Sequence, residues 1–129
     1  MDELEPLIRV TRDDHRREVH YWLSGLFSED LIPHVFSELF KASRPFIDDR
    51  KGFLVLGDLS AFKVQPRQLV EHMRFSQEAS AKAGVERMAI VYSSMLTMQQ
   101  FRRVSDALEC EFFTERQEAL KWLRCSHYD

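Results

Sequence analysis

Two short apolar runs constrain the fold of this chain more than any other feature. Residues 53–56 read FLVL between Gly52 and Gly57, and residues 88–92 read MAIVY. Each run is too short for a helix and is typical of a strand that is covered on both faces, as parallel strands are. We therefore expect both runs to lie inside a largely parallel sheet.

Segments with helical periodicity separate the predicted strands. Apolar side chains recur on one helix face at positions 31, 32, 35, 36, 39 and 40, which is the strongest periodic signal in the chain. Pro33 fits the first turn of this helix, and Pro45 predicts its end or a bend. A second helix should begin at Pro66 and end at Gly84, because proline suits a first helical turn and glycine a left-handed residue at the C-terminal end.

The predicted order of elements defines an α/β fold. Residues 7–11 and 17–23 form a β-hairpin around polar turn residues. The complete order is ββαβαβαβα, and the strands alternate with helices after the hairpin. This order predicts a mixed five-stranded sheet with four main helices. One domain should span residues 7–124, between an N-terminal tail at 1–6 and a C-terminal tail at 125–129.

Composition and charge argue against several functional classes. The 129 residues carry a net charge of −3, which argues against nucleic-acid binding because nucleic-acid-binding proteins gather a basic face. No apolar run approaches the roughly 20 residues that cross a bilayer, so we expect no membrane insertion. Cys110 and Cys125 show no CxxC spacing and are typical of the reduced cysteines of a cytoplasmic protein.

The sequence shows neither a metal-binding spacing nor a catalytic arrangement. The histidines do not follow a zinc-binding pattern; they are His15, His20, His34, His72 and His127. Gly52 and Gly57 flank a strand instead of opening a helix, so they do not form a phosphate-binding loop. We expect no cofactor, no metal site and no enzymatic activity.

Three segments, taken in order, carry a family resemblance: GFLVLGDLSAF, GVERMAIVYS and ECEFFTERQEALKWL. Together they resemble the STAS-like domains, a family that includes the bacterial anti-sigma-factor antagonists. The last segment is the most telling, because a short strand ending in Phe, an acidic turn and EALKWL are similar to the close of the family pattern. The resemblance spans roughly residues 7–124, and it implies an STAS-like fold and a role in protein interaction.

The chain departs from the antagonist branch of that family at one point. The resemblance would place a phosphorylatable serine at the start of the helix that follows the strand at residues 53–56. Gln65, Pro66 and Arg67 stand there instead, and Ser60 lies earlier in the chain. The resemblance therefore implies a module without this phosphorylation switch.

The predicted contact residues follow the third and fourth strands, because ligands of open α/β sheets bind beyond the carboxyl ends of the strands. We expect Asp58, Ser60 and Phe62 in the loop after the third strand. Asp58 and Ser60 either contact a partner or only close a turn, in which the carboxylate accepts backbone N–H groups. The turn interpretation is favoured.

The loop after the fourth strand should contain Tyr92, Ser93, Ser94, Met95 and Leu96. The hydroxyl groups of this loop either bind an anion or cap the following helix, and capping is favoured. Met95, Leu96 and the nearby Met98 belong either to the core or to a hydrophobic contact surface.

Phe75 points away from the apolar face of its helix, and we interpret it as a subunit contact. Two functions follow from the sequence. The first is a non-catalytic interaction module that recognises another protein or a second copy of itself. The alternative is a carrier or sensor of a small hydrophobic, lipid-like ligand, because some STAS-like proteins resemble the CRAL-TRIO lipid carriers in layout. In that case Met95, Leu96, Met98 and Phe62 would line the cavity.

Overall fold

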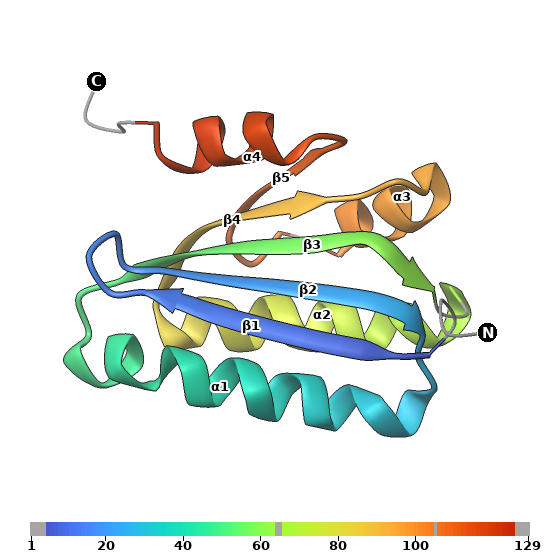
Figure 1. Ribbon diagram of the computed structural model, residues 1–129, viewed down its shortest axis with the longest axis horizontal. Helices are drawn as coiled ribbons and strands as arrows, with labels where there is room; N and C mark the ends of the chain where they lie inside the picture. Colours follow the sequence, from blue (N-terminus) through green and yellow to red (C-terminus); the bar gives the residue numbers. More distant parts are fainter. Residues whose placement is uncertain (1–4, 64–65, 105, 126–129) are drawn as a thin grey trace.

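The computed structural model describes residues 5–63, 66–104 and 106–125. The strands are β1 (Leu7–Asp13), β2 (Glu18–Leu26), β3 (Phe53–Lys63), β4 (Val85–Val91) and β5 (Glu109–Phe113). The helices are a short 3-10 turn η2 (Glu29–Leu31), α1 (Ile32–Asp49), α2 (Pro66–Ala83), α3 (Met95–Arg103) and α4 (Arg116–Leu123) (Figure 1). This is the predicted order ββαβαβαβα, with four main helices. Most of the two predicted tails lies outside the described residues.

The five strands form one mixed sheet in the order β1-β2-β3-β4-β5. β1 and β2 form the predicted antiparallel hairpin, whereas β2, β3, β4 and β5 are parallel neighbours. The two apolar runs of the sequence lie side by side, since Val55 pairs with Met88 and Leu56 with Ala89. The predicted fold class is therefore confirmed.

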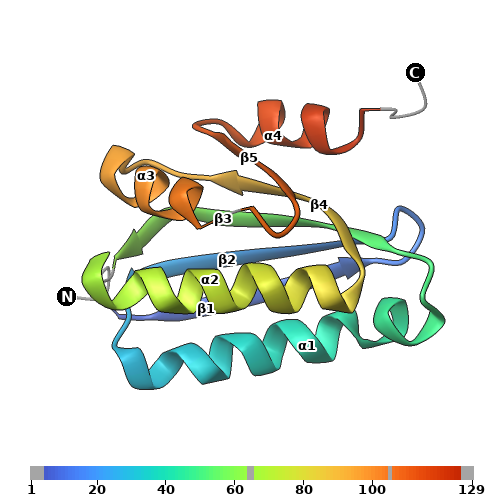
Figure 2. The ribbon, with the colours of Figure 1, turned by 180° about the vertical axis from the view of Figure 1, so that it is seen from behind.

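The sequential strand order distributes the helices unequally between the two faces of the sheet. Right-handed crossovers that always step to the next strand place their helices on one face. Accordingly α1, α2 and α3 pack in one core cluster, and Figure 2 shows α1 and α2 running side by side across that face. α4 lies on the opposite face, against β3, β4 and β5 (Figure 1). No described helix covers the α4 side of β1 and β2.

Two cores hold these layers together. The larger core lies between the sheet and α1, α2 and α3. The smaller core lies under α4, where Leu56, Ala89, Ala119 and Leu123 are completely buried. Burial of a large aliphatic side chain contributes roughly 1.5–3 kcal/mol, so these few contacts account for the docking of a helix only eight residues long.

The sequence predicted an end or a bend of the first helix at Pro45. The end is wrong, because α1 continues to Asp49, and the bend stays a prediction. Pro45 faces solvent, while the next residue, Phe46, is buried. The Phe46 ring packs on Phe53 with its centroid 5.5 Å away. This packing stabilises the last turn and offsets the backbone hydrogen bond that a proline cannot donate. Pro33 lies in the first turn, as predicted.

β3 is longer than predicted, and this corrects the position of three candidate contact residues. Asp58, Ser60 and Phe62 lie within β3 and not in a loop after it. The strand continues because β2 runs beside it as far as Leu26 and supplies backbone partners. A one-residue bulge lies between the pairs Trp22–Asp58 and Ser24–Ala61, and it re-aims the end of β3.

Candidate functional site

An apolar cavity of about 280 Å³ lies between α1 and α2, on the sheet face that both helices cover. Small-molecule sites typically have volumes of about 300–1,000 Å³, and this cavity lies just below that range. The strands supply its floor through Val19, Tyr21, Val55 and Met88, and the two helices supply its walls.

Aromatic side chains stand where α1 and α2 approach each other. Phe36 of α1 and Phe75 of α2 are in contact, with ring centroids 5.4 Å apart. Phe40 and Phe75 also line the cavity and are 52% and 58% exposed. On the cavity side of α2, Ser76 and Ser80 have small side chains. Large rings at the contact and small side chains beside it explain why the space between the helices stays open.

The floor of the cavity depends on a close approach between Tyr21 and Gly57. The Tyr21 ring occupies the place where a side chain at position 57 would stand. Tyr21 is almost completely buried, and burial raises the pKa of its phenol far above the ordinary value. The phenol therefore stays uncharged at neutral pH.

The cavity contains no charged side chain among the described residues. Its polar atoms belong to Tyr21, Ser43, Ser76 and Ser80. An ionised ligand group would lose its hydration there without gaining a counter-charge, which is unfavourable. A neutral apolar ligand, in contrast, gains from the removal of its surface from water. The chemistry of the lining therefore favours an uncharged apolar group over an ionised one.

A second cavity, of about 50 Å³, continues the first one towards α3. The two cavities share Tyr21, Phe36, Leu39 and Ser76. Phe62, one of the predicted contact residues, lines this second space together with Phe101 of α3. Of the side chains predicted to line a ligand cavity, Phe62 does so, whereas Met98 is buried in α3.

Asp58 and Ser60 contact each other at the bulge. The Asp58 carboxylate oxygen Oδ1 accepts hydrogen bonds from the Ser60 backbone N–H at 3.0 Å and from the Ser60 hydroxyl at 2.6 Å. This is the geometry that the turn interpretation predicts, although it occurs inside a strand. A partner contact by these two residues stays a prediction.

The structure brings the two predicted contact groups together at one point. The Ser93 hydroxyl donates to the Ser60 backbone carbonyl at 2.6 Å. Ser94 caps α3, because its hydroxyl oxygen accepts the Thr97 backbone N–H at 3.2 Å. Tyr92 Oη lies 3.9 Å from the Met95 sulfur. These hydroxyl groups therefore have partners within the chain.

Met95 and Leu96 are exposed at the start of α3, at 60% and 54% respectively. They line neither of the two apolar cavities. The cavity predicted at this loop is therefore not one of these two. As a contact surface they stay a prediction, and so does Phe75 as a subunit contact.

On the other face of the sheet, a polar network joins β2 to both ends of α4. Glu18 is only 1% exposed and accepts two hydrogen bonds from the Arg124 guanidinium, at 2.8 and 2.9 Å. His20 Nε2 lies 2.9 Å from the Glu18 carboxylate. His20 Nδ1 lies 2.8 Å from Nη2 of Arg116. Because a guanidinium can only donate, His20 is a neutral ring that accepts from Arg116 and donates to Glu18.

The pKa values in this network follow from burial and charge. Burial lowers the pKa of His20, and the positive charges of Arg116 and Arg124 act in the same direction against Glu18. Burial alone would raise the pKa of Glu18, but the hydrogen bonds from Arg124 and His20 outweigh it and lower the pKa. The network therefore contains a carboxylate and a neutral imidazole at neutral pH.

The sequence analysis predicted neither the cavity between α1 and α2 nor this network. The small residues Ser76 and Ser80, opposite Phe36 and Phe40 of the neighbouring helix, are the signal that could have indicated the cavity. Within the described parts of the chain, no three His, Cys, Asp or Glu side chains are grouped as a metal site would require. No helix there is long and apolar enough to span a membrane.

This fold, with three helices on one face and one on the other, is that of a SpoIIAA-like domain. The family model described as SpoIIAA-like matches residues 9–124, so the chain belongs to the SpoIIAA-like family. The STAS-like resemblance of the sequence is thereby confirmed. No curated protein matches the sequence significantly.

Two solved structures show the same fold at low sequence identity. One is an uncharacterised protein of the DUF3478 family from Shewanella loihica PV-4 with a SpoIIAA-like fold; it is 17% identical, with a TM-score of 0.63 over 92% of this chain and 93% of that one. The other is an anti-sigma factor antagonist from Mycobacterium paratuberculosis, also 17% identical, with a TM-score of 0.58 over 92% and 96%.

Proposed function

We propose that this protein is a non-catalytic binding module that holds a small, uncharged hydrophobic molecule between α1 and α2. The observation that carries this proposal is the apolar cavity of about 280 Å³ and its aromatic walls. The sequence favoured an interaction module and gave ligand binding as the alternative. Because of the cavity, we place ligand binding first and the interaction module second.

The chemistry of the cavity supports binding without catalysis. Its lining offers hydroxyl groups and aromatic rings, and its one titratable group among the described residues, Tyr21, is held in the neutral form by burial. General acid–base catalysis needs a group whose pKa lies near the working pH. The cavity is suited to hold a molecule and not to transform it.

A neutral fluorescent probe, N-phenyl-1-naphthylamine, tests this proposal. The wild-type protein should bind the probe and increase its fluorescence. Ser80→Leu places a larger apolar side chain in the cavity, so it should weaken binding by about tenfold or more, equivalent to about 1.4 kcal/mol. Native mass spectrometry of the freshly purified protein should also show a co-purified hydrophobic compound.

Ser37→Leu is the matched control, because Ser37 lies exposed on α1 and lines neither apolar cavity. This variant introduces the same leucine and should bind the probe as the wild type does. The proposal is wrong if the wild-type protein does not bind the probe, or if both variants bind it as tightly as the wild type.

A regulatory protein-interaction module is the second candidate function. Met95 and Leu96 are adjacent, exposed apolar residues at the start of α3, and such patches are typical of contact surfaces. The likeness to an anti-sigma factor antagonist supports a protein partner or a second copy of the chain. Regulation would not use a helix-start phosphoserine, because Gln65, Pro66 and Arg67 have no hydroxyl group.

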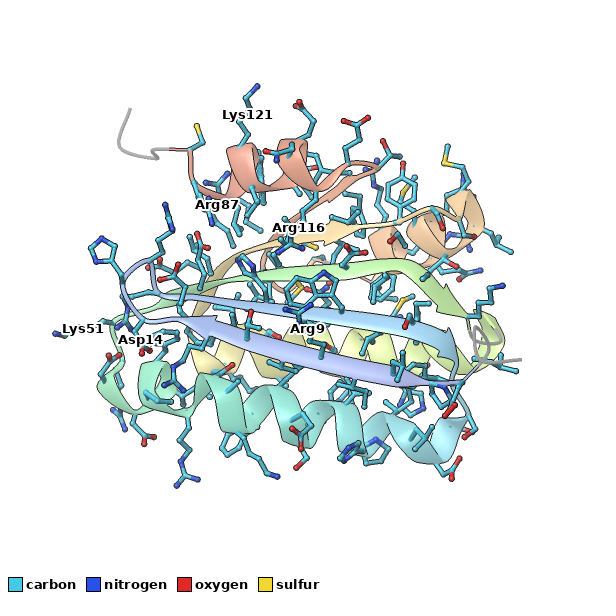
Figure 3. The ribbon with its side chains drawn as sticks, in the orientation of Figure 1. Arg9, Asp14, Lys51, Arg87, Arg116 and Lys121 are labelled. Atoms are coloured by element: carbon cyan, nitrogen blue, oxygen red, sulfur yellow. The ribbon has the colours of Figure 1, made fainter. Side chains whose placement is uncertain are left out.

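Sedimentation equilibrium tests the second-copy form of this candidate. If Phe75 is a subunit contact, Phe75→Asp should weaken the dimer by about tenfold or more, because it buries a charge in an apolar interface. Lys121→Asp introduces the same side chain on α4, on the opposite side of the sheet (Figure 3), and should leave the dimer intact. A wild-type protein that stays monomeric would contradict this form of the proposal.

A further inference from the structure

The part of the sheet that no described helix covers carries a surface of different chemistry from the cavity. Arg9 of β1, Trp22 of β2 and Arg116 of α4 meet there, and we call these three residues the arginine–tryptophan face. The guanidinium carbons of Arg9 and Arg116 lie 4.8 and 4.6 Å from the centroid of the Trp22 ring. Figure 3 shows both arginines on the same side of the sheet.

The carboxylates near this face are already engaged. Glu18 accepts both of its short guanidinium contacts from Arg124. Asp58 Oδ1 accepts from Ser60, and its Oδ2 lies 4.0 Å from Arg116, which is the outer limit of an ion pair. Within the described chain, Arg9 makes no ion pair with a carboxylate.

Two guanidinium groups, those of Arg9 and Arg116, therefore lie around the Trp22 ring without a close carboxylate partner among the described residues. Burial lowers the pKa of Arg116, and the positive charges of Arg124 and Arg9 lower it further against the opposing effect of Asp58 and Glu18. Burial is the largest cause of this direction, and the strongest charge effect, that of Asp58, opposes it. A carboxylate of a partner placed beside Arg9 and Arg116 would supply the close contact that these guanidinium groups lack among the described residues.

The shape of the face favours a macromolecule over a small ligand. Arg9 is exposed on the edge strand β1, and α4 rises as a wall over β3 and β4 (Figure 1). The two apolar cavities are lined by other residues. Small ligands are usually held in concave sites, whereas protein partners bind to open surfaces. The face offers two guanidinium groups, which match a few carboxylates of a partner and not the many phosphates that a nucleic acid presents.

We propose that the arginine–tryptophan face is a docking surface for an acidic segment of a partner protein. Carboxylates of the partner would bind Arg9 and Arg116, and an apolar side chain of the same segment would pack on the Trp22 ring. Arginine and tryptophan are enriched among the residues that dominate protein interfaces. Guanidinium–carboxylate contacts supply the charge complementarity. This proposal is independent of the ligand cavity, which lies on the other side of the sheet.

Isothermal titration calorimetry with the full chain and a glutamate-rich peptide that carries one central leucine tests the proposal. The peptide should bind, and its affinity should fall as the salt concentration rises. Arg9→Gln should weaken binding by about fivefold, which corresponds to about 1 kcal/mol for one interfacial charge contact. Arg9 is exposed and has no carboxylate partner among the described residues, so this variant should fold normally.

Lys41→Gln is the matched control, because Lys41 is an exposed cation on α1, on the opposite side of the sheet. It should leave peptide binding unchanged, and a lysine-rich peptide should not bind the wild type. The proposal is overturned if the acidic peptide does not bind at about 1 mM, or if Arg9→Gln and Lys41→Gln have the same effect. It is also overturned if free glutamate or inorganic phosphate binds as tightly as the peptide, since the face would then be a small-anion site.

Discussion

The Tyr21 ring lies directly on Gly57 of the neighbouring parallel strand. The two residues are register partners between β2 and β3, and a Cβ atom at position 57 would overlap the Cζ and Oη atoms of Tyr21. Position 57 therefore requires glycine, because the Tyr21 side chain lies very close to the β3 backbone there. The same approach places the phenol in the floor of the apolar cavity.

Gly57→Ala should destabilise the protein by about 1–3 kcal/mol, because the added methyl group overpacks a filled part of the core. Urea unfolding monitored by circular dichroism measures this change in the free energy of unfolding. In a Tyr21→Leu background the ring is gone, so Gly57→Ala should cost distinctly less. Equal costs in the two backgrounds would show that the ring is not the obstacle.

Pro45→Ala should stabilise the protein by about 2 kcal/mol. Pro45 lies inside α1, where it cannot donate a backbone hydrogen bond and its ring crowds the preceding turn. This loss of stability exceeds the stabilisation that a proline provides by restricting the unfolded chain. Pro33→Ala is the control, because Pro33 lies in the first turn, where no intrahelical N–H donor is needed. The midpoints of urea unfolding should rise for Pro45→Ala alone. If that variant lost stability instead, Pro45 would not be a source of strain in α1.

The sequence contains the signals for the order of elements because those signals are local. The apolar run at residues 53–56 predicted the beginning of β3, and Pro66 and Gly84 predicted the two ends of α2. The end of α1 was not predictable from Pro45 alone, because the contact of Phe46 with Phe53 decides it. Tertiary packing of this kind overrides a local preference.

The candidate site was less predictable because it depends on distances between elements. The gap between α1 and α2 results from the Phe36–Phe75 contact, which joins residues on different helices. The network on the other face joins Glu18 to Arg124 across 106 positions of sequence. Periodicity can place Glu18 and His20 on one face of a strand, but it cannot identify the helix that will supply their arginine partners.

Arg124→Met should destabilise the protein by about 1–3 kcal/mol, because it leaves the buried Glu18 carboxylate without its main hydrogen-bond donor. The partial exposure of Arg124 keeps the expected cost below that of a fully buried pair. Glu18→Gln in the same variant removes the stranded charge, so the double variant should be more stable than the sum of the single effects predicts. Additive free energies of unfolding would show that the two residues do not interact.

The stability of the protein should decrease as the pH falls below about 6.5, the ordinary pKa of histidine. The folded-state pKa of His20 is lowered, first by burial and then by the charges of Arg116 and Arg124. In the window between the lowered pKa and the ordinary pKa, the unfolded chain binds more protons at this position than the folded chain does. Stability contributed by the neutral ring is thus complete above that window and is lost as the pH falls through it. Glu18, whose pKa is also lowered, adds a further loss of the same sign at lower pH.

Urea unfolding at pH 7.5 and pH 5.5 measures this effect of His20. His20→Gln removes the titratable ring, so the variant should lose less stability between the two pH values than the wild type does, although it is less stable at neutral pH. The same substitution at His34, which is exposed on α1, should leave the pH dependence of the wild type intact. If His20→Gln and His34→Gln lose as much stability as the wild type over this interval, another group controls the acid sensitivity. The ring between Glu18 and Arg116 would then be only a structural contact.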